Sequence, residues 1–277
     1  MANSAYGSGI SLDALMVNTK AATVFQAQEA SLFLGGALIP MVNVPAGSMT
    51  AQVPVLNSVA ATKISSEATV GSDLETVLPT DTKVLINVDV HAARTVLRDL
   101  GGVDANDIGR QLGAAVSKSF DEDCAAALGN LTAQEVNGSL DLAKILAGVE
   151  TIRGAGETGQ LYGIISTSSY TDLMVAIGNA AYAGGDFQTE ALRNGFVGNI
   201  AGVQMFVSSY LNDTNTGAAN TKCAIFGADA MRIAMQRNVD LEVERRAAAV
   251  GFDVVASLHA GVGVVDATRG VLLADQT

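Results

Sequence analysis

The apolar residues between positions 104 and 128 recur at every fourth position, which is the spacing of one face of an α-helix. They are Ile108, Leu112, Val116, Phe120, Cys124 and Leu128. Asp104 fits an N-cap, Asp107 lies where the helix dipole favours negative charge, and Gly129 follows the last turn. A helix of about 25 residues is roughly 37 Å long, and a strict four-residue step drifts around its axis. The sequence therefore predicts a structural spine against which several other elements pack.

Two stretches before this helix alternate apolar and polar residues, as half-buried strands do. The first is Met49 to Val55, where Pro54 favours an edge position because proline donates no ladder hydrogen bond. The second is Lys83 to Val90, with Val84, Ile86, Val88 and Val90 expected on one face. The polar residues 57–82 separate the two, which predicts a long two-stranded ribbon with a protruding tip. A lone ribbon is marginally stable in water, so it needs a surface to lie on.

The rest of the chain mixes short helices and strands, without a repeat. Residues 1–10 are expected to form a flexible terminus, and Ser11 to Phe33 one or two short helices or an extended arm. A helix capped by Ser139 and a helix from Thr167 to Ile177 follow the spine. A glycine-containing loop with a short helix is expected at Gly184 to Asn199, and a polar loop at Asn212 to Thr221. The predicted strands are Leu161–Ile165, Val203–Val207, Cys223–Phe226, Leu241–Val243, Phe252–Leu258, Val262–Val265 and Gly270–Leu273.

Charge is scarce in this chain. Only 16% of the residues are charged, against about 25% in ordinary soluble domains, while 49% are hydrophobic. Much of the surface is therefore expected to face other protein. The net charge of −12 argues against a dedicated nucleic-acid binder and against attraction to anionic lipid. The most apolar stretch, Leu32 to Val44, is too short to span a bilayer.

No motif predicts catalysis, a metal or a cofactor. Gly154-x-Gly156-x-x-Gly159 matches a dinucleotide-binding pattern, but a helix precedes it and a strand follows, which favours a simple turn. The acidic run at residues 121–123 is expected to form a solvated helix face, because consecutive helical residues do not converge. The remaining candidates are expected to be packing or surface residues: His91, His259, Cys124 and Cys223.

Five segments, in this order, resemble major capsid proteins of tailed bacteriophages with the Hong Kong 97-type fold, especially in the short-tailed (podovirus-type) branch. The resemblance covers most of residues 23–273 and depends on the order of the segments, since no single one is specific. They are PAGSMTAQVPVL (Pro45–Leu56), TDTKVLINVDVHAARTVLRDL (Thr80–Leu100), DIGRQLGAAVSKSFDEDCAAAL (Asp107–Leu128), GNIAGVQMFVSSYL (Gly198–Leu211) and ERRAAAVGFDVVASLHAGVGVVDATRGVLL (Glu244–Leu273).

This resemblance implies an α+β fold with an N-terminal arm at 1–45 and an extended hairpin, the E-loop, at 46–92. It implies a peripheral domain with the spine helix at 93–153, an axial domain at 154–228, and return strands at 229–277. The implied function is a non-enzymatic shell protein that assembles as pentamers and hexamers around double-stranded DNA, without reading its sequence and without a membrane. A separate scaffolding protein, a portal and cement proteins are the implied partners, and assembly in the bacterial host cytoplasm yields the virion.

Local charge suggests one contact between subunits. The hairpin tip is acidic, and three arginines flank the start of the spine, so the tip is predicted to dock on these arginines of a neighbouring copy. The candidate interface residues are Lys63, Glu67, Asp73, Glu75, Arg94, Arg98 and Arg110. The alternative is that they are unrelated surface charges, each of little energetic value. Two alternatives to the viral shell also remain: an encapsulin-like nanocompartment, and a soluble acidic α/β binding protein or enzyme.

Overall fold

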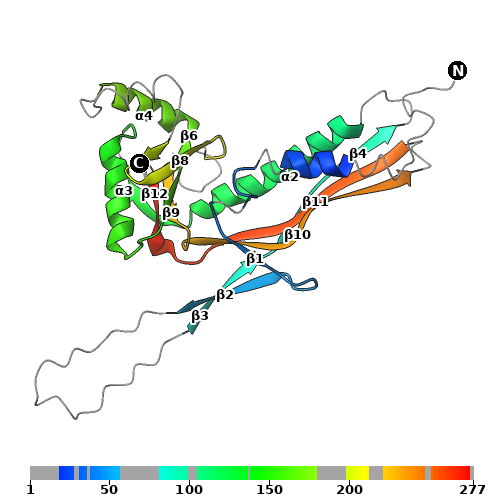
Figure 1. Cartoon of the computed structure of the whole chain (residues 1–277), viewed down its shortest axis with the longest axis horizontal. Helices are drawn as coiled ribbons and strands as arrows, with labels where there is room; N and C mark the ends of the chain where they lie inside the picture. The colour runs from blue at the N-terminus through cyan, green and yellow to red at the C-terminus, as the bar shows by residue number, and fades with distance from the viewer. Residues whose placement is uncertain are drawn as a thin grey trace, which may run out of the picture.

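The structure is a computed structural model that describes residues 19–27, 31–35, 38–56, 81–98, 105–136, 138–179, 198–211, 221–246 and 251–274. This part of the chain forms two sheets, a separate hairpin and the helices that cover them (Figure 1). The first sheet has the order β1-β10-β11-β4, with β1 at Met41–Asn43, β4 at Asp89–Arg98, β10 at Met231–Arg246 and β11 at Gly251–Val264. The α+β class is as predicted.

The second sheet is mixed, with the order β5-β12-β9-β6-β8-β7. Helices α3 (Leu142–Gly154) and α4 (Thr167–Asn179) pack against it around a core that includes Ile145, Ile152 and Leu173. Its strands are β5 (Thr132–Glu135), β6 (Leu161–Ser166), β7 (Asn199–Ile200), β8 (Val203–Ser208), β9 (Thr221–Gly227) and β12 (Gly270–Ala274). The predicted strands and the helix near Thr167 lie here within two residues of their expected bounds.

The spine helix is α2 (Ala105–Leu128), and it lies along β11 and β4 (Figure 1). Its predicted stripe is confirmed: every member from Leu112 to Leu128 is buried, and Ile108 is half-buried. The stripe belongs to one continuous core that extends from the four-stranded sheet to Phe226 of the six-stranded sheet. The proposed cap Asp104 lies outside the described residues.

The hairpin consists of β2 (Thr50–Leu56) and β3 (Asp81–Asn87), paired only with each other among the described strands. This agrees with the edge position predicted from Pro54. The apolar face of the hairpin packs on the base of the four-stranded sheet, where Ala51, Ile86 and Ala234 are buried. Strands β3 and β11 cross closely, because a Cβ atom built on Gly261 of β11 would lie 1.8 Å from the carbonyl oxygen of Asn87 of β3. Glycine is therefore required at this crossing.

Several details differ from the sequence prediction. The expected strand from Lys83 to Val90 is interrupted at Val88, so that Val90 faces solvent instead of the core, with 55% of its surface exposed. Strand β11 is continuous where a break was expected before Val262, and β10 begins at Met231, well before the predicted strand. Helix α3 is capped by Asp141, whose carboxylate accepts from the Lys144 amide at 2.9 Å, and not by Ser139.

Four regions of the prediction lie outside the described residues: most of the N-terminal arm, the hairpin tip, and both long loops after α4. Residues 19–27 are helical, in agreement with the expected arm helix. Within the described ranges, no helix combines the length and the hydropathy that crossing a membrane requires.

Candidate functional site

The three consecutive acidic residues on α2, at positions 121–123, contact three different parts of the molecule. Asp121 is fully buried and accepts hydrogen bonds from the Ser31 hydroxyl at 2.6 Å and the Leu32 amide at 3.0 Å. Glu122 lies 3.8 Å from Lys118 on the same helix. Asp123 points to His91 of β4, with 3.6 Å between carboxylate oxygen and Nε2. The prediction of a solvated face is therefore wrong for Asp121, which anchors the N-terminal segment to the spine.

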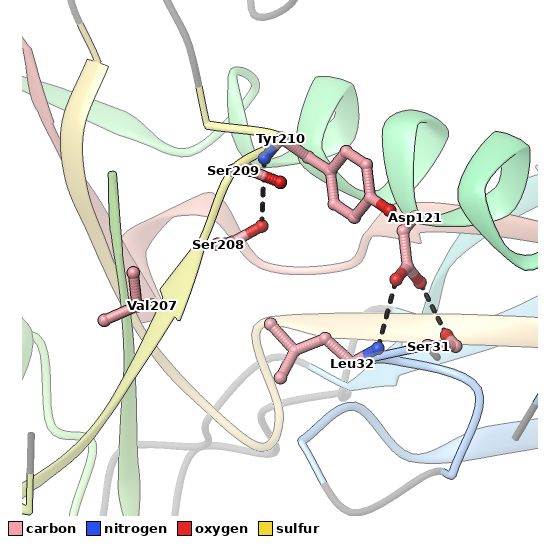
Figure 2. Close-up of a pocket in the computed structure, with 7 residues that line it drawn as sticks. All are labelled: Ser31, Leu32, Asp121, Val207, Ser208, Ser209 and Tyr210. Carbon is pink, nitrogen blue, oxygen red and sulfur yellow. Dashed lines mark hydrogen bonds between the residues drawn. The ribbon is translucent and has the colours of Figure 1, made fainter. Parts of the chain in front are cut away.

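Burial raises the pKa of Asp121, and the hydrogen bonds from Ser31 and Leu32 oppose that shift. Figure 2 shows this carboxylate at the wall of a hollow of ≈320 Å³, beside Ser31 and the end of β8. The Tyr210 ring extends toward the same carboxylate, and burial, together with the nearby charges of Asp121 and Glu122, raises the pKa of Tyr210. The hollow therefore marks a junction of arm, spine and sheet. Its lining offers hydroxyl groups and one carboxylate that already accepts two hydrogen bonds.

The arm helix at residues 19–27 lies in a groove on α2 that two glycines create. A Cβ atom on Gly113 would lie 2.4 Å from the carbonyl oxygen of Thr23, and one on Gly109 would lie 2.8 Å from that of Thr19. Lys20 adds an ion pair with Asp240 of β10. The spacing Gly109-x-x-x-Gly113 is a sequence signal for the close approach of another helix, and neither glycine belongs to the apolar stripe.

Of the predicted interface arginines, Arg94 is already paired within its own chain. Its guanidinium donates from Nε to Asp253 at 2.7 Å and makes a second bond through Nη2, which raises the pKa of Arg94 and lowers that of Asp253. Arg110 is exposed on α2, and Arg98 ends β4 opposite Gly251. The structure therefore places all three arginines along the spine and its neighbouring strand. Lys63, Glu67, Asp73 and Glu75 lie outside the described residues.

Large apolar side chains are exposed near the hairpin and on β4. The exposed fraction is 70% for Met49, 61% for Leu85, 55% for Val90 and 38% for Val96. Strand β4 forms an edge of its sheet within the described residues, so one side of its backbone has no strand beside it. Exposed apolar residues next to an open strand edge are typical of a surface that another chain covers.

The glycine turn, His91 and the two cysteines have environments that fit roles in the fold. The glycine pattern at Gly154 forms the turn between α3 and β6, as predicted, and Gly156 has a φ of +93°. His91 is buried edge-on to Phe120, and its Nδ1 lies 3.0 Å from the Ser119 hydroxyl. Cys124 and Cys223 are both buried and free, and burial raises the pKa of each thiol. Among the described residues, no three histidine, cysteine or acidic side chains are grouped so that they could hold a metal ion.

Comparison with known proteins identifies the fold. No family model and no curated protein sequence matches this chain. The capsid of cyanophage P-SCSP1u is similar over 86% of both chains, with a TM-score of 0.68 and 18% identity. The mature capsid of bacteriophage PhiM1 is similar over 89% of this chain and 87% of its own, with a TM-score of 0.66 and 16% identity.

A virus-like particle from Pyrococcus furiosus is also similar, over 93% of this chain and 98% of its own, with a TM-score of 0.63 and 11% identity. The chain therefore has the Hong Kong 97-type capsid fold over most of its length, as its sequence pattern predicted. The similar structures also include the capsid of a myovirus and that of a GTA particle, so they do not single out the short-tailed branch.

Proposed function

We propose that this chain is a major capsid protein that assembles into the icosahedral shell enclosing the double-stranded DNA of a phage. The observation that supports this most is the similarity to phage capsid structures over 86–89% of the chain, since the aligned part is long enough to include the spine and both sheets. A shared fold does not by itself fix a function, so the chain's own surface must supply a second argument.

That argument is the chain's uncovered apolar surface. The hairpin has one face on the sheet and leaves Met49 and Leu85 mostly exposed on the other parts of its surface. In a monomer this surface would face water, whereas in a shell neighbouring copies would cover it. Each square ångström of apolar surface buried in this way contributes about 25 cal/mol, offset by the costs of association.

We further propose which part of the chain forms each domain of the shell subunit. The arm at 1–45 and the hairpin at 46–92 reach neighbouring subunits, and α2 with the four-stranded sheet forms the peripheral domain. The six-stranded sheet forms the axial domain around fivefold and sixfold axes. Because α3 packs on this sheet, we place α3 in the axial domain, although the sequence resemblance implied a peripheral domain that extends to residue 153. We also propose that the chain assembles as pentamers and hexamers with a separate scaffolding protein, a portal and cement proteins. Its destination is the virion, and it belongs to the short-tailed branch.

The acidic tip remains a proposed contact, with Arg98 and Arg110 as its partners on the neighbour, because Arg94 already binds Asp253. We expect Arg98→Glu combined with Arg110→Glu to block shell formation and to leave soluble subunits. Lys118→Glu reverses a charge on the same helix, one whose side chain is 61% exposed, and is the control. Normal shells from the double variant would remove this contact.

Sedimentation of the purified chain tests the proposal, alone and together with the proposed scaffolding protein. We expect pentamers, hexamers or megadalton shells. A monomer in both preparations would contradict the proposal and favour the soluble binding protein or enzyme.

The similarity to the Pyrococcus furiosus particle keeps an encapsulin-like compartment as the second candidate. The two differ in what the shell encloses. Particles isolated from infected cells and treated with nuclease are expected to retain double-stranded DNA. Particles that instead retain a co-purifying enzyme and no DNA would establish the second candidate.

A further inference from the structure

The two sheets are joined by one antiparallel ribbon that is interrupted at the same place in both of its strands. β9 pairs with β12 in the six-stranded sheet, and β10 pairs with β11 in the four-stranded sheet. β9 continues into β10 through residues 228–230, and β11 continues into β12 through residues 265–269. Figure 1 shows these two crossovers side by side between the sheets. We call this paired interruption the hinge between the two sheets.

The two crossovers are held together by backbone hydrogen bonds to one atom. The amides of Val265 and Asp266 both donate to the carbonyl oxygen of Ala230, at 2.8 and 3.1 Å. Two bonds to one acceptor fix the crossovers to each other, beside the core that the two sheets share.

Arg269 adds a polar restraint at this junction, because its guanidinium contacts carboxylates from three different segments. Nε donates to Asp266 of its own crossover at 3.1 Å. Nη1 donates to Asp229 of the other crossover at 3.4 Å and to Glu157, in the turn between α3 and β6, at 3.2 Å. A planar guanidinium donates along fixed directions, so these three contacts restrict rotation about the hinge.

Glu157 is itself held firmly on the six-stranded side. It is only 5% exposed, and its carboxylate accepts from the Gly159 amide at 2.7 Å. A Cβ atom on Gly159 or Gly227 would lie within 2.9 Å of that side chain, so both glycines are needed to make room for it. Arg153 donates to the Glu157 carbonyl oxygen at 2.9 Å. Arg269 thus joins the hinge to a buried, well-packed carboxylate.

The hairpin reaches the same cluster. A hollow of ≈190 Å³ is lined on one side by Val53, Pro54 and Val55 of β2, and on the other by Asp229, Arg232, Asp266 and Arg269. The two sheets and the hairpin therefore meet around one arginine.

We propose that Arg269 is a positioning residue that sets the angle between the two sheets and, through it, the curvature of the assembled shell. The proposal rests on the shell function proposed above. Many copies must close into one shell, so a small spread in the angle of each subunit accumulates around the particle. A subunit without this restraint folds but closes at several radii or fails to close.

The test compares three variants with the wild-type chain. Arg269→Lys keeps the charge and removes the planar fork. Asp229→Asn removes one exposed carboxylate of the cluster, which binds Arg232 at 2.7 Å as well as Arg269 at 3.4 Å. Arg237→Lys is the matched control, because Arg237 also contacts two carboxylates, Asp240 and Glu242, but lies on β10 away from the crossovers. Circular dichroism establishes folding, and electron microscopy gives the distribution of shell diameters.

Wild-type and Arg237→Lys shells are expected to have one diameter. Arg269→Lys and Asp229→Asn are expected to give shells of several diameters, or assemblies that do not close, at an unchanged melting temperature. Uniform shells of wild-type diameter from both cluster variants would overturn the proposal. If Arg269→Lys does not fold, the outcome for Asp229→Asn decides.

A wild-type chain that forms no shells would contradict the proposed function but would not test the role of Arg269. Small-angle scattering of unassembled subunits then tests the hinge. A larger spread of maximum dimension in the cluster variants supports the inference, and profiles identical to wild type reject it.

Discussion

Removal of the Asp121 carboxylate is the perturbation whose size the structure defines best. Asp121→Ala leaves the Ser31 hydroxyl and the Leu32 amide without their acceptor, at 2.6 and 3.0 Å in the native chain. Hydrogen bonds to a charged group contribute about 1.5–3 kcal/mol each. The cost of burying the charge, which also disappears, offsets part of this loss. We therefore expect the free energy of unfolding to fall by about 2–4 kcal/mol.

For a chain of this size, 1 kcal/mol corresponds to roughly 2 °C in melting temperature, so we expect a decrease of about 4–8 °C. Calorimetry of unassembled subunits measures it. Glu122→Ala is the matched control, because that side chain is 42% exposed and its ion pair with Lys118 spans 3.8 Å. Such pairs contribute about 0.3–0.5 kcal/mol. Equal shifts for the two variants would refute the assignment of Asp121 as the anchor of the N-terminal segment.

The same carboxyl gives the anchor a pH dependence. Burial raises the pKa of Asp121 in the folded chain above its value of about 3.9 in the unfolded chain. A group with a raised folded pKa contributes stability that is complete below the unfolded pKa and is lost as the pH rises through the folded pKa. The stability of wild type relative to Asp121→Asn is therefore expected to fall as the pH rises from below about 3.9 through the raised folded pKa of Asp121. Urea unfolding across this range measures it, and a relative stability that rises with pH would contradict the assignment.

Two further predictions concern close packing. Gly261→Ala is expected to displace the hairpin, because the new Cβ would lie 1.8 Å from the Asn87 carbonyl oxygen, whereas Gly154→Ala, which meets nothing within 4 Å, is expected to be tolerated. Hydrogen exchange of the hairpin amides distinguishes these outcomes, and equal protection in both variants would count against the crossing. Cys124 and Cys223 are expected to resist thiol reagents until the chain unfolds, since burial raises the pKa of both thiols. Rapid labelling of native subunits would contradict their burial.

The spine was predictable because helix periodicity is a local property. The residues of its stripe need only a common face, and the four-residue spacing supplies it for Leu112 through Leu128. The edge position of Pro54 was predictable for a similar reason, since a missing amide excludes a central strand. In both cases a single residue type or spacing determines the outcome.

The burial of Asp121 was not predictable in this way, because its partners lie about 90 residues earlier in the chain. The apparent break in β11 has a related cause. Gly261 weakens the strand pattern locally, yet it is there because Asn87 of another strand crosses over it. Strand β10 was missed at its start because polar residues such as Arg232 and Gln236 obscure the alternation, although both form hydrogen bonds in the structure.

If the proposed function is correct, copies of this chain complete one another's surface in a closed shell. Electron micrographs of the expressed chain, alone and together with the proposed scaffolding protein, show whether such shells form. We expect closed icosahedral particles of uniform diameter. Fields that contain only dispersed single subunits, at every protein concentration tried, would contradict it.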